Sequence, residues 1–393
     1  MTAHSSRLTR RKVLKGAGAT AGALALAGCS GSGGGGSGGN DSTDSGSGGN
    51  DSTDSGSGGS GGQMPTVQVA GGGGSWKEAR FASFFTPFQE GNPPWQNEHK
   101  VKYTEKASNQ YMSEIKRNPE NPSFDLVELD NMRAPLLGEQ DALVNQEEEI
   151  DNMSNLPSAF KNEYMGGTTV FPRGIAYRQD KLDKEFTSWD DLIDPDLEGK
   201  VAFEPWANAG SKFFYVINNA KGGDLNNLDP GFEWLKEFVD TVDPVFFDQV
   251  DKAMQLFRNE EIYVASFLSA RTSSLRINDG LDMKLSIPEE GSVADYWGYP
   301  LLKHRPDANK EAGKEFLEGA YTAEAQAGFA EDFGYPPAVP EAQELISEEV
   351  KEKRPFITLS PDQLERFDNG IDWVQVEKQQ AEDGQRWRKI VSS

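Results

Sequence analysis

The sequence predicts an α/β fold, and repeated strand-to-helix units are the main observation behind this prediction. Segments with the alternation of a strand are followed by segments with helical spacing of apolar residues, which indicates βα units. Residues 64–393 form a chain long enough for two lobes, each with its own core. Ligands of such folds bind at the carboxyl ends of the strands. The expected segments are strands at Lys100–Glu105, Asp125–Leu129, Lys200–Glu204 and Ile262–Phe267, and helices at Ser108–Arg117, Ser211–Ala220 and Arg271–Asp279.

The first unit of the folded part joins a strand to a helix through a glycine loop. Pro65–Ala70 has the β-branched alternation of a strand, and Gly71–Gly74 follows it. Ser75 as the N-cap and Glu78 at the third helical position form a capping box. No Gly-Lys-Ser/Thr follows, so the loop is no P-loop. It is either a tight connection or the edge of a cleft. One buried face of the helix is predicted to carry Phe81, Phe84, Phe85 and Phe88.

The N-terminus has the features of an exported lipoprotein. Arg10 and Arg11 precede a short stretch rich in Ala and Gly, which ends in Leu-Ala-Gly-Cys at Cys29. This pattern is similar to a twin-arginine signal peptide, 1–28, that is cut before a lipid-carrying Cys29. Cys29 is the only cysteine, so the folded part has no disulfide, no cysteine zinc site and no thiol nucleophile.

Residues 29–63 are predicted to be a disordered linker behind the lipidated cysteine. From Ser30 to Gly62 the chain is built from Gly, Ser, Asn, Asp and Thr, and one ten-residue sequence occurs twice, at 40–49 and 50–59. Without apolar residues, such a segment cannot offset the entropy of ordering. A flexible coil of this length has a reach of about 30 Å.

The excess of acidic over basic residues indicates the environment in which the protein works. The net charge is −24, and removal of the signal peptide removes five basic residues and no acid. The acids are spread along the chain, a pattern that resembles proteins of halophilic archaea, whose carboxylates keep the surface hydrated in strong salt. Binding to nucleic acid is excluded on the same ground, because the phosphate backbone needs a basic surface.

Several segments of the folded part, in order, resemble extracellular solute-binding proteins of ABC importers, of the spermidine/putrescine-binding type (family 1-like). The resemblance covers nearly all of residues 64–393. The segments that carry it are Val69–Glu90 with its glycine loop and phenylalanines, Phe124–Val127, Gly167–Arg178, Ser188–Leu192, Asp194–Val201, Pro288–Gly291 and Phe333–Pro337.

This resemblance implies a two-lobed, periplasmic-binding-protein-like fold of type II, with lobes joined by a two-segment hinge. The first lobe is expected at 64–168 and 297–393 and the second at 169–296, with crossings near Thr168–Gly174 and Gly291–Trp297. The implied function is capture of a small polar solute by hinge closure at the outer face of the cytoplasmic membrane. The partners are the solute and the permease and ATPase subunits of an ABC importer. We expect a monomer without catalysis, cofactor or metal.

The candidate ligand contacts come from strand ends, helix starts and the returning crossing. Each has an alternative, purely structural role, since tryptophans usually pack in the core, Arg271 could form a surface ion pair and Asp295 could pair with a lysine. The candidates are Ser75, Trp76, Asp130, Asn131, Trp206, Asn208, Ser211, Ser269, Arg271, Asp295, Tyr296, Trp297 and Tyr335.

The charge of the solute stays open at this stage. Aromatic rings with a carboxylate suit an amine. However, Trp297 stands where amine-binding relatives carry an acid, and Asp295 lies two residues away. A polyamine is therefore one candidate, and Arg271 equally permits a carboxylate, phosphonate or sulfonate. Iron is a less well supported candidate solute. His99 and His304 are the only histidines of the mature chain, and the spacing of the tyrosines does not match a set of metal ligands.

Two other classes of protein are possible but less well supported. A secreted hydrolase needs a nucleophile with a base or a metal site, and two histidines without a folded Gly-x-Ser-x-Gly give little support for either. A structural surface protein would show internal repeats in its folded part, and repeats occur only in the linker.

The dispersed acids predict that stability rises with salt. Near 1 M salt the Debye length falls to about 3 Å, so repulsion among surface carboxylates is largely screened. We expect a higher melting temperature in molar salt than in dilute buffer, measured by differential scanning calorimetry. An unchanged melting temperature would contradict this expectation.

Overall fold

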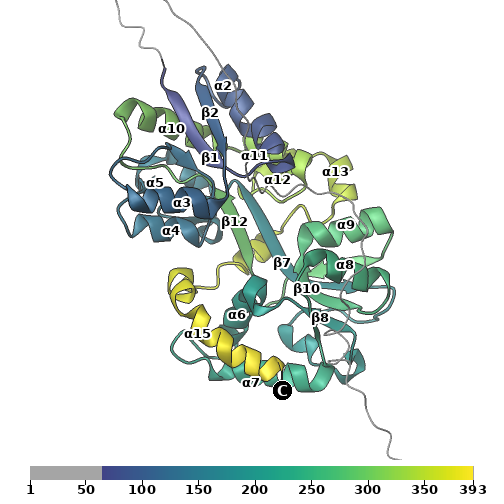
Figure 1. Ribbon diagram of the computed structural model, residues 1–393. Helices are drawn as coiled ribbons and strands as arrows, with labels where there is room; N and C mark the ends of the chain where they lie inside the picture. Colours follow the sequence, from purple (N-terminus) through teal and green to yellow (C-terminus); the bar gives the residue numbers. More distant parts are fainter. Residues whose placement is uncertain (1–63, 393) are drawn as a thin grey trace, which may run out of the picture. The chain divides into compact units, whose positions relative to one another are not determined.

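The structure is a computed structural model that describes residues 64–392, which belong to one unit of the chain, 61–393 (Figure 1). The predicted signal peptide, Cys29 and the linker lie outside the described residues. Within the described part, no helix has the length and apolarity to cross a membrane. The strands are β1 Thr66–Gly71, β2 Lys100–Glu105, β3 Leu126–Val127, β4 Leu129–Asp130, β5 Lys161–Asn162, β6 Met165–Gly166, β7 Thr169–Arg178, β8 Val201–Phe203, β9 Val245–Phe246, β10 Val264–Leu268, β11 Met283–Ser286 and β12 Ala294–Gly298. The α-helices are α1 Ser75–Arg80, α2 Thr86–Glu90, α3 Ser108–Arg117, α4 Arg133–Gly138, α5 Gln146–Glu149, α6 Ser211–Ala220, α7 Asp229–Val242, α8 Val250–Arg258, α9 Ser269–Asp279, α10 Asp307–Ala320, α11 Ala323–Phe333, α12 Ala342–Leu345, α13 Glu348–Lys353, α14 Pro361–Glu365 and α15 Trp373–Val391.

The first lobe is built on a parallel sheet with strand order β2-β1-β3. The helical segment between β1 and β2 is α1, a π-helical turn at Phe81–Phe85 and α2, and it buries Phe84, Phe85 and Phe88 in the first core. The predicted capping box at its start is wrong. Gly74 is the N-cap, with a φ of 66° that suits glycine, and its carbonyl accepts the Glu78 N–H.

The second lobe contains most of a mixed sheet with the order β4-β12-β7-β10-β8-β9, in which β11 also pairs with β7. The central strand β7 is ten residues long. Its first half pairs with β12 and its second half pairs with β11, both antiparallel. Because β10 occupies the other edge of β7, a single long strand serves both lobes.

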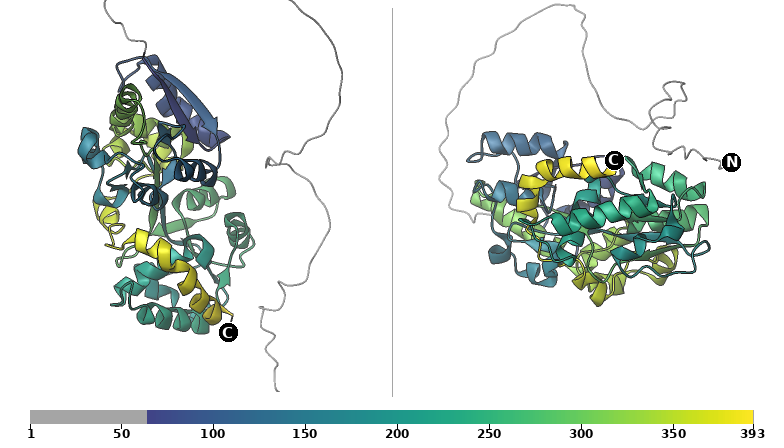
Figure 2. Two further views of the ribbon diagram at one scale, coloured as in Figure 1. Left: turned by 60° about the vertical axis from the view of Figure 1, so that its left-hand side comes forward. Right: turned by 90° about the horizontal axis from the view of Figure 1, so that it is seen from below.

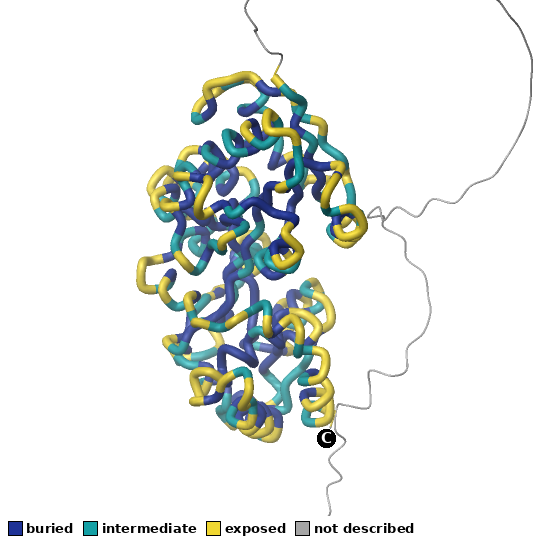
Figure 3. The backbone as a smooth tube through the Cα atoms, turned by 90° about the vertical axis from the view of Figure 1, so that its left-hand side faces the viewer, coloured by how far each residue is buried: buried dark blue, intermediate teal, exposed yellow. Residues whose placement is uncertain are grey.

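The paired strands β7 and β12 connect the two cores, as expected from the sequence. Val170 on β7 belongs to the core of the first lobe, whereas Ile175 on the same strand belongs to that of the second. The return follows β12, since Val293 just before it lies in the second core and Tyr296 lies in the first. Figure 3 shows buried backbone continuing through this crossing.

The chain crosses between the lobes once more near its C-terminus, which the sequence had not predicted. Phe367 packs in the first core, whereas Val376 and Trp387 of α15 pack in the second. Figures 1 and 2 show α15 beside α6 and α7. The lobe boundaries at 168 and 297 stay a prediction. The assignment of all of 297–393 to the first lobe is wrong for α15, which packs in the core of the second lobe. The apolar stripe of α15 has its complement there, against aromatic rings such as Phe203.

We expect Trp387→Ala to lower the free energy of unfolding by about 3–5 kcal/mol, because it leaves a cavity among aromatic side chains. Hydrogen exchange should show loss of protection in β8 and α7 with little change in β1. The control is Leu345→Ala, an exposed apolar residue, with an expected effect within about 0.5 kcal/mol. Equal loss of protection in β1 would place α15 with the first lobe.

Candidate ligand-binding cleft

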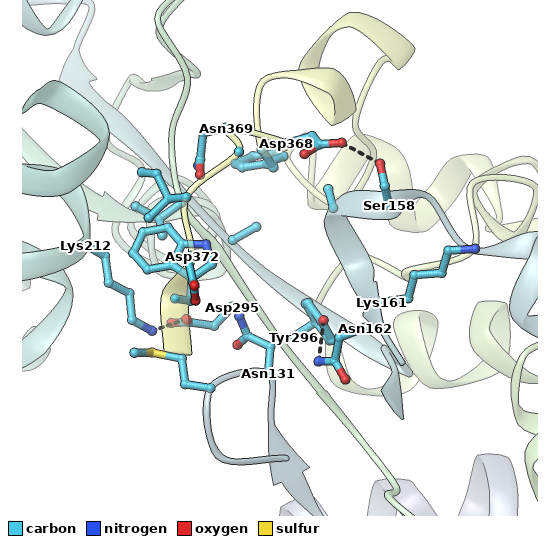
Figure 4. Close-up of a pocket in the computed structure, with 18 of the residues that line it drawn as sticks. Asn131, Ser158, Lys161, Asn162, Lys212, Asp295, Tyr296, Asp368, Asn369 and Asp372 are labelled. Carbon is cyan, nitrogen blue, oxygen red and sulfur yellow. Dashed lines mark hydrogen bonds and ion pairs between the residues drawn. The ribbon is translucent and has the colours of Figure 1, made fainter. Parts of the chain in front are cut away.

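Two cavities of the described structure are lined by residues of both lobes. The first has a volume of about 290 Å³ and is lined by Asn131 of the first lobe, Lys212 of the second, and Asp295 and Tyr296 on β12 (Figure 4). The segment 367–374, which contains the third crossing, closes one side of it. Residues of both lobes and of the connections therefore surround this space.

The second cavity, of about 380 Å³, lies between α9 of the second lobe and two segments of the first. Arg271 lines it from α9, and Tyr335 and Arg354 line it from the opposite lobe. Both cavities are thus lined by residues of both lobes, and β12 lines the first of them.

The floor of this cleft is one face of the β7–β12 pair. Phe171 stands opposite Asp295 in the register, and Thr169 stands opposite Trp297. Directly opposed residues of paired strands share a face, and side chains alternate along each strand. The opposite face carries Tyr296, whose hydroxyl accepts a hydrogen bond from the Asn162 amide at 3.0 Å.

A cluster of four charged groups occupies the end of the floor near the second lobe. Asp295 accepts a hydrogen bond from Arg173 at 2.7 Å and another from Lys212 on α6. Arg173 Nε also lies 3.4 Å from a carboxylate oxygen of Glu204, which follows β8. Figure 4 shows Lys212 extended toward Asp295.

The pKa values of the two carboxyls move in opposite directions. Burial acts to raise the pKa of Asp295, but the positive charges of Lys212 and Arg173 outweigh burial and lower it to about 2. Burial raises the pKa of Glu204, and Arg173 only partly offsets this rise. Lys212 and Arg173 therefore stabilise the ionised form of Asp295, whereas burial disfavours the ionised form of Glu204.

Aromatic side chains form the wall of the cleft on the first lobe. The ring of Trp76 lies 5.8 Å from Phe171 and 6.2 Å from Trp297, measured between centroids. Tyr335 lies 4.5 Å from Phe171 and 5.5 Å from Phe333. Rings at these separations make favourable stacked, tilted and edge contacts, so the wall is a packed unit.

A buried ion pair fixes the Trp76 ring in this wall. Glu128 accepts a hydrogen bond from the Trp76 indole at 2.7 Å and lies 3.1 Å from Arg80 Nε. The Arg80 guanidinium covers the Trp76 ring at 4.4 Å and donates to the Thr168 hydroxyl at 2.7 Å. Both charged side chains are fully buried, so the indole is held both by a hydrogen bond and by packing.

Seven of the predicted contacts lie at the floor, wall or cavities. Asp295 and Trp297 lie on the floor, and Trp76 and Tyr335 lie in the wall. Asn131 and Arg271 line the cavities, and Tyr296 reaches the first cavity from the opposite face of its strand. These positions agree with a cleft, but direct contact with a ligand stays a prediction.

Other predicted contacts lie elsewhere or have a structural role. Trp206 is in the core of the second lobe, where its indole donates to the Gln380 carbonyl on α15, so we withdraw it as a ligand contact. Asp130 accepts hydrogen bonds from the Met132 and Arg133 amides at the start of α4. Ser75 and Asn208 are exposed, whereas Ser211 and Ser269 are buried in the first turns of α6 and α9.

Sequence reasoning missed Arg173, Lys212, Glu204 and Phe171. The alternation of Thr169, Phe171 and Arg173 along a strand that crosses between lobes could have indicated the floor. No local signal connects Lys212 or Glu204 with Asp295, because they lie on separate elements.

Two lobes joined by crossing strands, with a cleft between them, define a protein that binds a small ligand between its lobes. Residues 84–356 match the model of the bacterial extracellular solute-binding protein family, and the chain belongs to this family. No curated protein sequence matches the chain significantly.

Solved structures of solute-binding proteins have the same fold. An ABC transporter structure from Clostridium perfringens superposes with a TM-score of 0.69 at 20% identity, over 83% of this chain and 99% of that one. The open, unliganded binding protein AttC of Agrobacterium tumefaciens gives 0.68 at 18%, over 83% and 99%. The spermidine/putrescine transporter substrate-binding protein PotD of Streptococcus pneumoniae gives 0.59 at 17%, over 82% and 99%. These likenesses establish the periplasmic-binding-protein-like fold.

We expect Asp295→Asn to lower the free energy of unfolding at neutral pH by about 3–5 kcal/mol, because two buried cations lose their carboxylate. The matched control is Asp190→Asn, which removes an exposed partner of Lys221 and should cost under about 1 kcal/mol.

The same variant has an expected pH dependence. The folded pKa of Asp295 lies below the ordinary 3.8, so its stabilising contribution is complete above that value and is lost as pH falls toward 2. Urea unfolding from about pH 7 to about pH 3 should show the gap between wild type and Asp295→Asn narrowing. A gap that widens as the pH falls would contradict this assignment.

Proposed function

We propose that the protein is the extracellular substrate-binding component of an ABC importer and captures a small organic ion between its lobes. Membership of the solute-binding family supports the class. The Clostridium perfringens structure and PotD, which share the fold, are described as ABC transporter proteins, and this supports the importer. The proposed anchor at Cys29 and export by a twin-arginine signal rest on the sequence alone.

The observation that carries the proposal is the β7–β12 floor with groups of both lobes beside it. Trp76 contacts the floor from the first lobe, and Lys212 contacts it from the second. A ligand on this floor touches both lobes, so it favours the closed arrangement by its higher affinity for that arrangement. Such a mechanism is reversible binding and involves no covalent step.

The charges of the cleft favour a solute with an acidic group, such as a carboxylate, phosphonate or sulfonate. Asp295 is already paired with Arg173 and Lys212, and an amine would have to displace one of them. The side chain of Arg271 has no ion pair or hydrogen bond within residues 64–392. The ring of Trp76 is covered by Arg80, which reduces its attraction for a second cation.

A polyamine or other amine is the second candidate, and the aromatic wall supports it. Trp297 and Tyr335 are half-buried and carry rings that suit an ammonium group. An amine would then be held by ring contacts and not by Asp295.

The test is a thermal-shift screen of the full chain in molar salt against carboxylates, phosphonates, sulfonates, amino acids and polyamines. A ligand at about 100 times its Kd should stabilise the fold by about 2.7 kcal/mol, which raises the melting temperature visibly. Trp297→Ala should weaken the binding of the best ligand about ten-fold or more, as measured by calorimetry.

The matched control is Tyr263→Ala, a half-buried aromatic residue of the second lobe that packs against Lys200. It should leave affinity unchanged. A shift with polyamines alone would favour the second candidate. A folded protein that responds to no compound of the screen would count against capture of an organic ion.

A further inference from the structure

We infer that the cavity beside α9 is a binding site for a small oxyanion, such as a phosphate, sulfate or carboxylate group, and that this anion bridges the two lobes. The site is separate from the β7–β12 floor. Anion binding there does not depend on the proposed function, whereas its effect on solute capture does.

The cavity is lined by both lobes. On one side is α9, whose Leu275 packs in the core that contains β10. On the other side are Phe333 and α13, whose Val350 packs against the core of the first lobe. An occupant of this space therefore contacts both lobes at once.

The lining is basic in a chain that is strongly acidic overall. Arg271, Lys353 and Arg354 line the cavity, and no aspartate or glutamate of the described part of the chain does so. The whole chain has 63 acidic residues against 39 lysines and arginines, so a cavity with three cations and no acid departs from the general pattern. Three positive charges that line one cavity favour an anion with at least two acceptor oxygens.

Arg271 and Arg354 have donors to offer. Within the described chain Arg271 makes no hydrogen bond or ion pair, and its charge acts on the nearby Tyr335 hydroxyl. Arg354 donates from Nη1 to the Glu331 carbonyl at 3.1 Å, which orients the guanidinium and leaves its other N–H groups to donate to a ligand. Among residues 64–392, Lys353 is paired only with Glu349 on the exposed surface, where such pairs are weak.

The absence of a side chain at Gly334 allows the Arg354 guanidinium to lie close to the backbone at this residue. Its φ is +85°, and a Cβ at this position would lie 2.5 Å from Arg354 Nη1. A side chain at residue 334 would therefore displace the Arg354 guanidinium from this position. The donor groups of the first lobe depend on this glycine for their position.

The oxyanion has two possible sources, which share the same chemistry. It is either the acidic group of the captured solute or a separate inorganic anion from the medium. In the first case inorganic phosphate competes with the solute. In the second case bound phosphate favours the closed arrangement, and the solute binds more tightly in its presence.

The test is a titration of the full chain with inorganic phosphate by calorimetry, with the ionic strength held constant by chloride. We expect saturable binding at one site, weakened about ten-fold or more by Arg271→Gln and by Lys353→Gln. The matched control is Arg258→Gln. It removes a surface arginine of the second lobe, the lobe of Arg271, and this arginine pairs with Asp279. This control should bind phosphate as the wild type does.

Arg271 and Lys353 are exposed, so both variants should fold, and near-UV circular dichroism checks this. Absence of saturable binding, or equal binding by wild type and Arg271→Gln, would overturn the site. Small-angle scattering should show a smaller radius of gyration with phosphate, and phosphate binding without compaction would overturn the bridging role. Because the titration contains no solute, phosphate binding with a silent solute screen would leave this site intact and reject the proposed function alone.

Discussion

The antiparallel pairing of β7 with β12 is the constraint on which the rest of the structure depends. These strands carry the chain from one core to the other and back, so their hydrogen bonds fix the register of everything that projects between the lobes. Alternation along the strands gives one face to the cleft and the other to the first core. A shift of one residue would exchange Asp295 for Tyr296 on the floor, which would bury the carboxylate in an apolar core.

Charged side chains buried beside this floor cost desolvation free energy, and they hold the cleft in a single arrangement. Removing charged groups from water is unfavourable unless each finds partners, and removal of one partner leaves the others exposed to that penalty. The floor meets this requirement with Asp295 between Arg173 and Lys212, and the wall meets it with Arg80 against Glu128. Both groups hold neighbouring aromatic and charged side chains in a single arrangement, which is preorganisation for binding.

The distribution of charge separates the surface of the protein from its cleft. Acids dominate the chain as a whole, whereas the charged side chains that line the cavity beside α9 are all basic among the described residues. Low-dielectric walls focus such local fields, so an anion can be drawn to a protein whose net charge would repel it. This contrast is the physical reason for preferring an acidic solute to an amine.

The sequence by itself determined the local elements and the class of fold. The bounds predicted for β2, α3 and α6 agree with the structure, because strand and helix periodicity are local properties of the chain. The family resemblance gave the two lobes and the crossings near residues 168–174 and 291–297. Position at a strand end or in a crossing was enough to bring Asp295, Trp297, Trp76 and Tyr335 into the candidate site.

Only the tertiary structure decided which side chains meet. Arg173, Glu204, Lys212 and Asp295 come from β7, the end of β8, α6 and β12, and no periodicity relates elements so far apart in the chain. In the same way, the burial of Trp206 follows from α15, which returns to the second lobe because the aromatic complement of its apolar stripe lies there. Packing between distant segments is set by shape and buried area, and these exist only once the chain has folded.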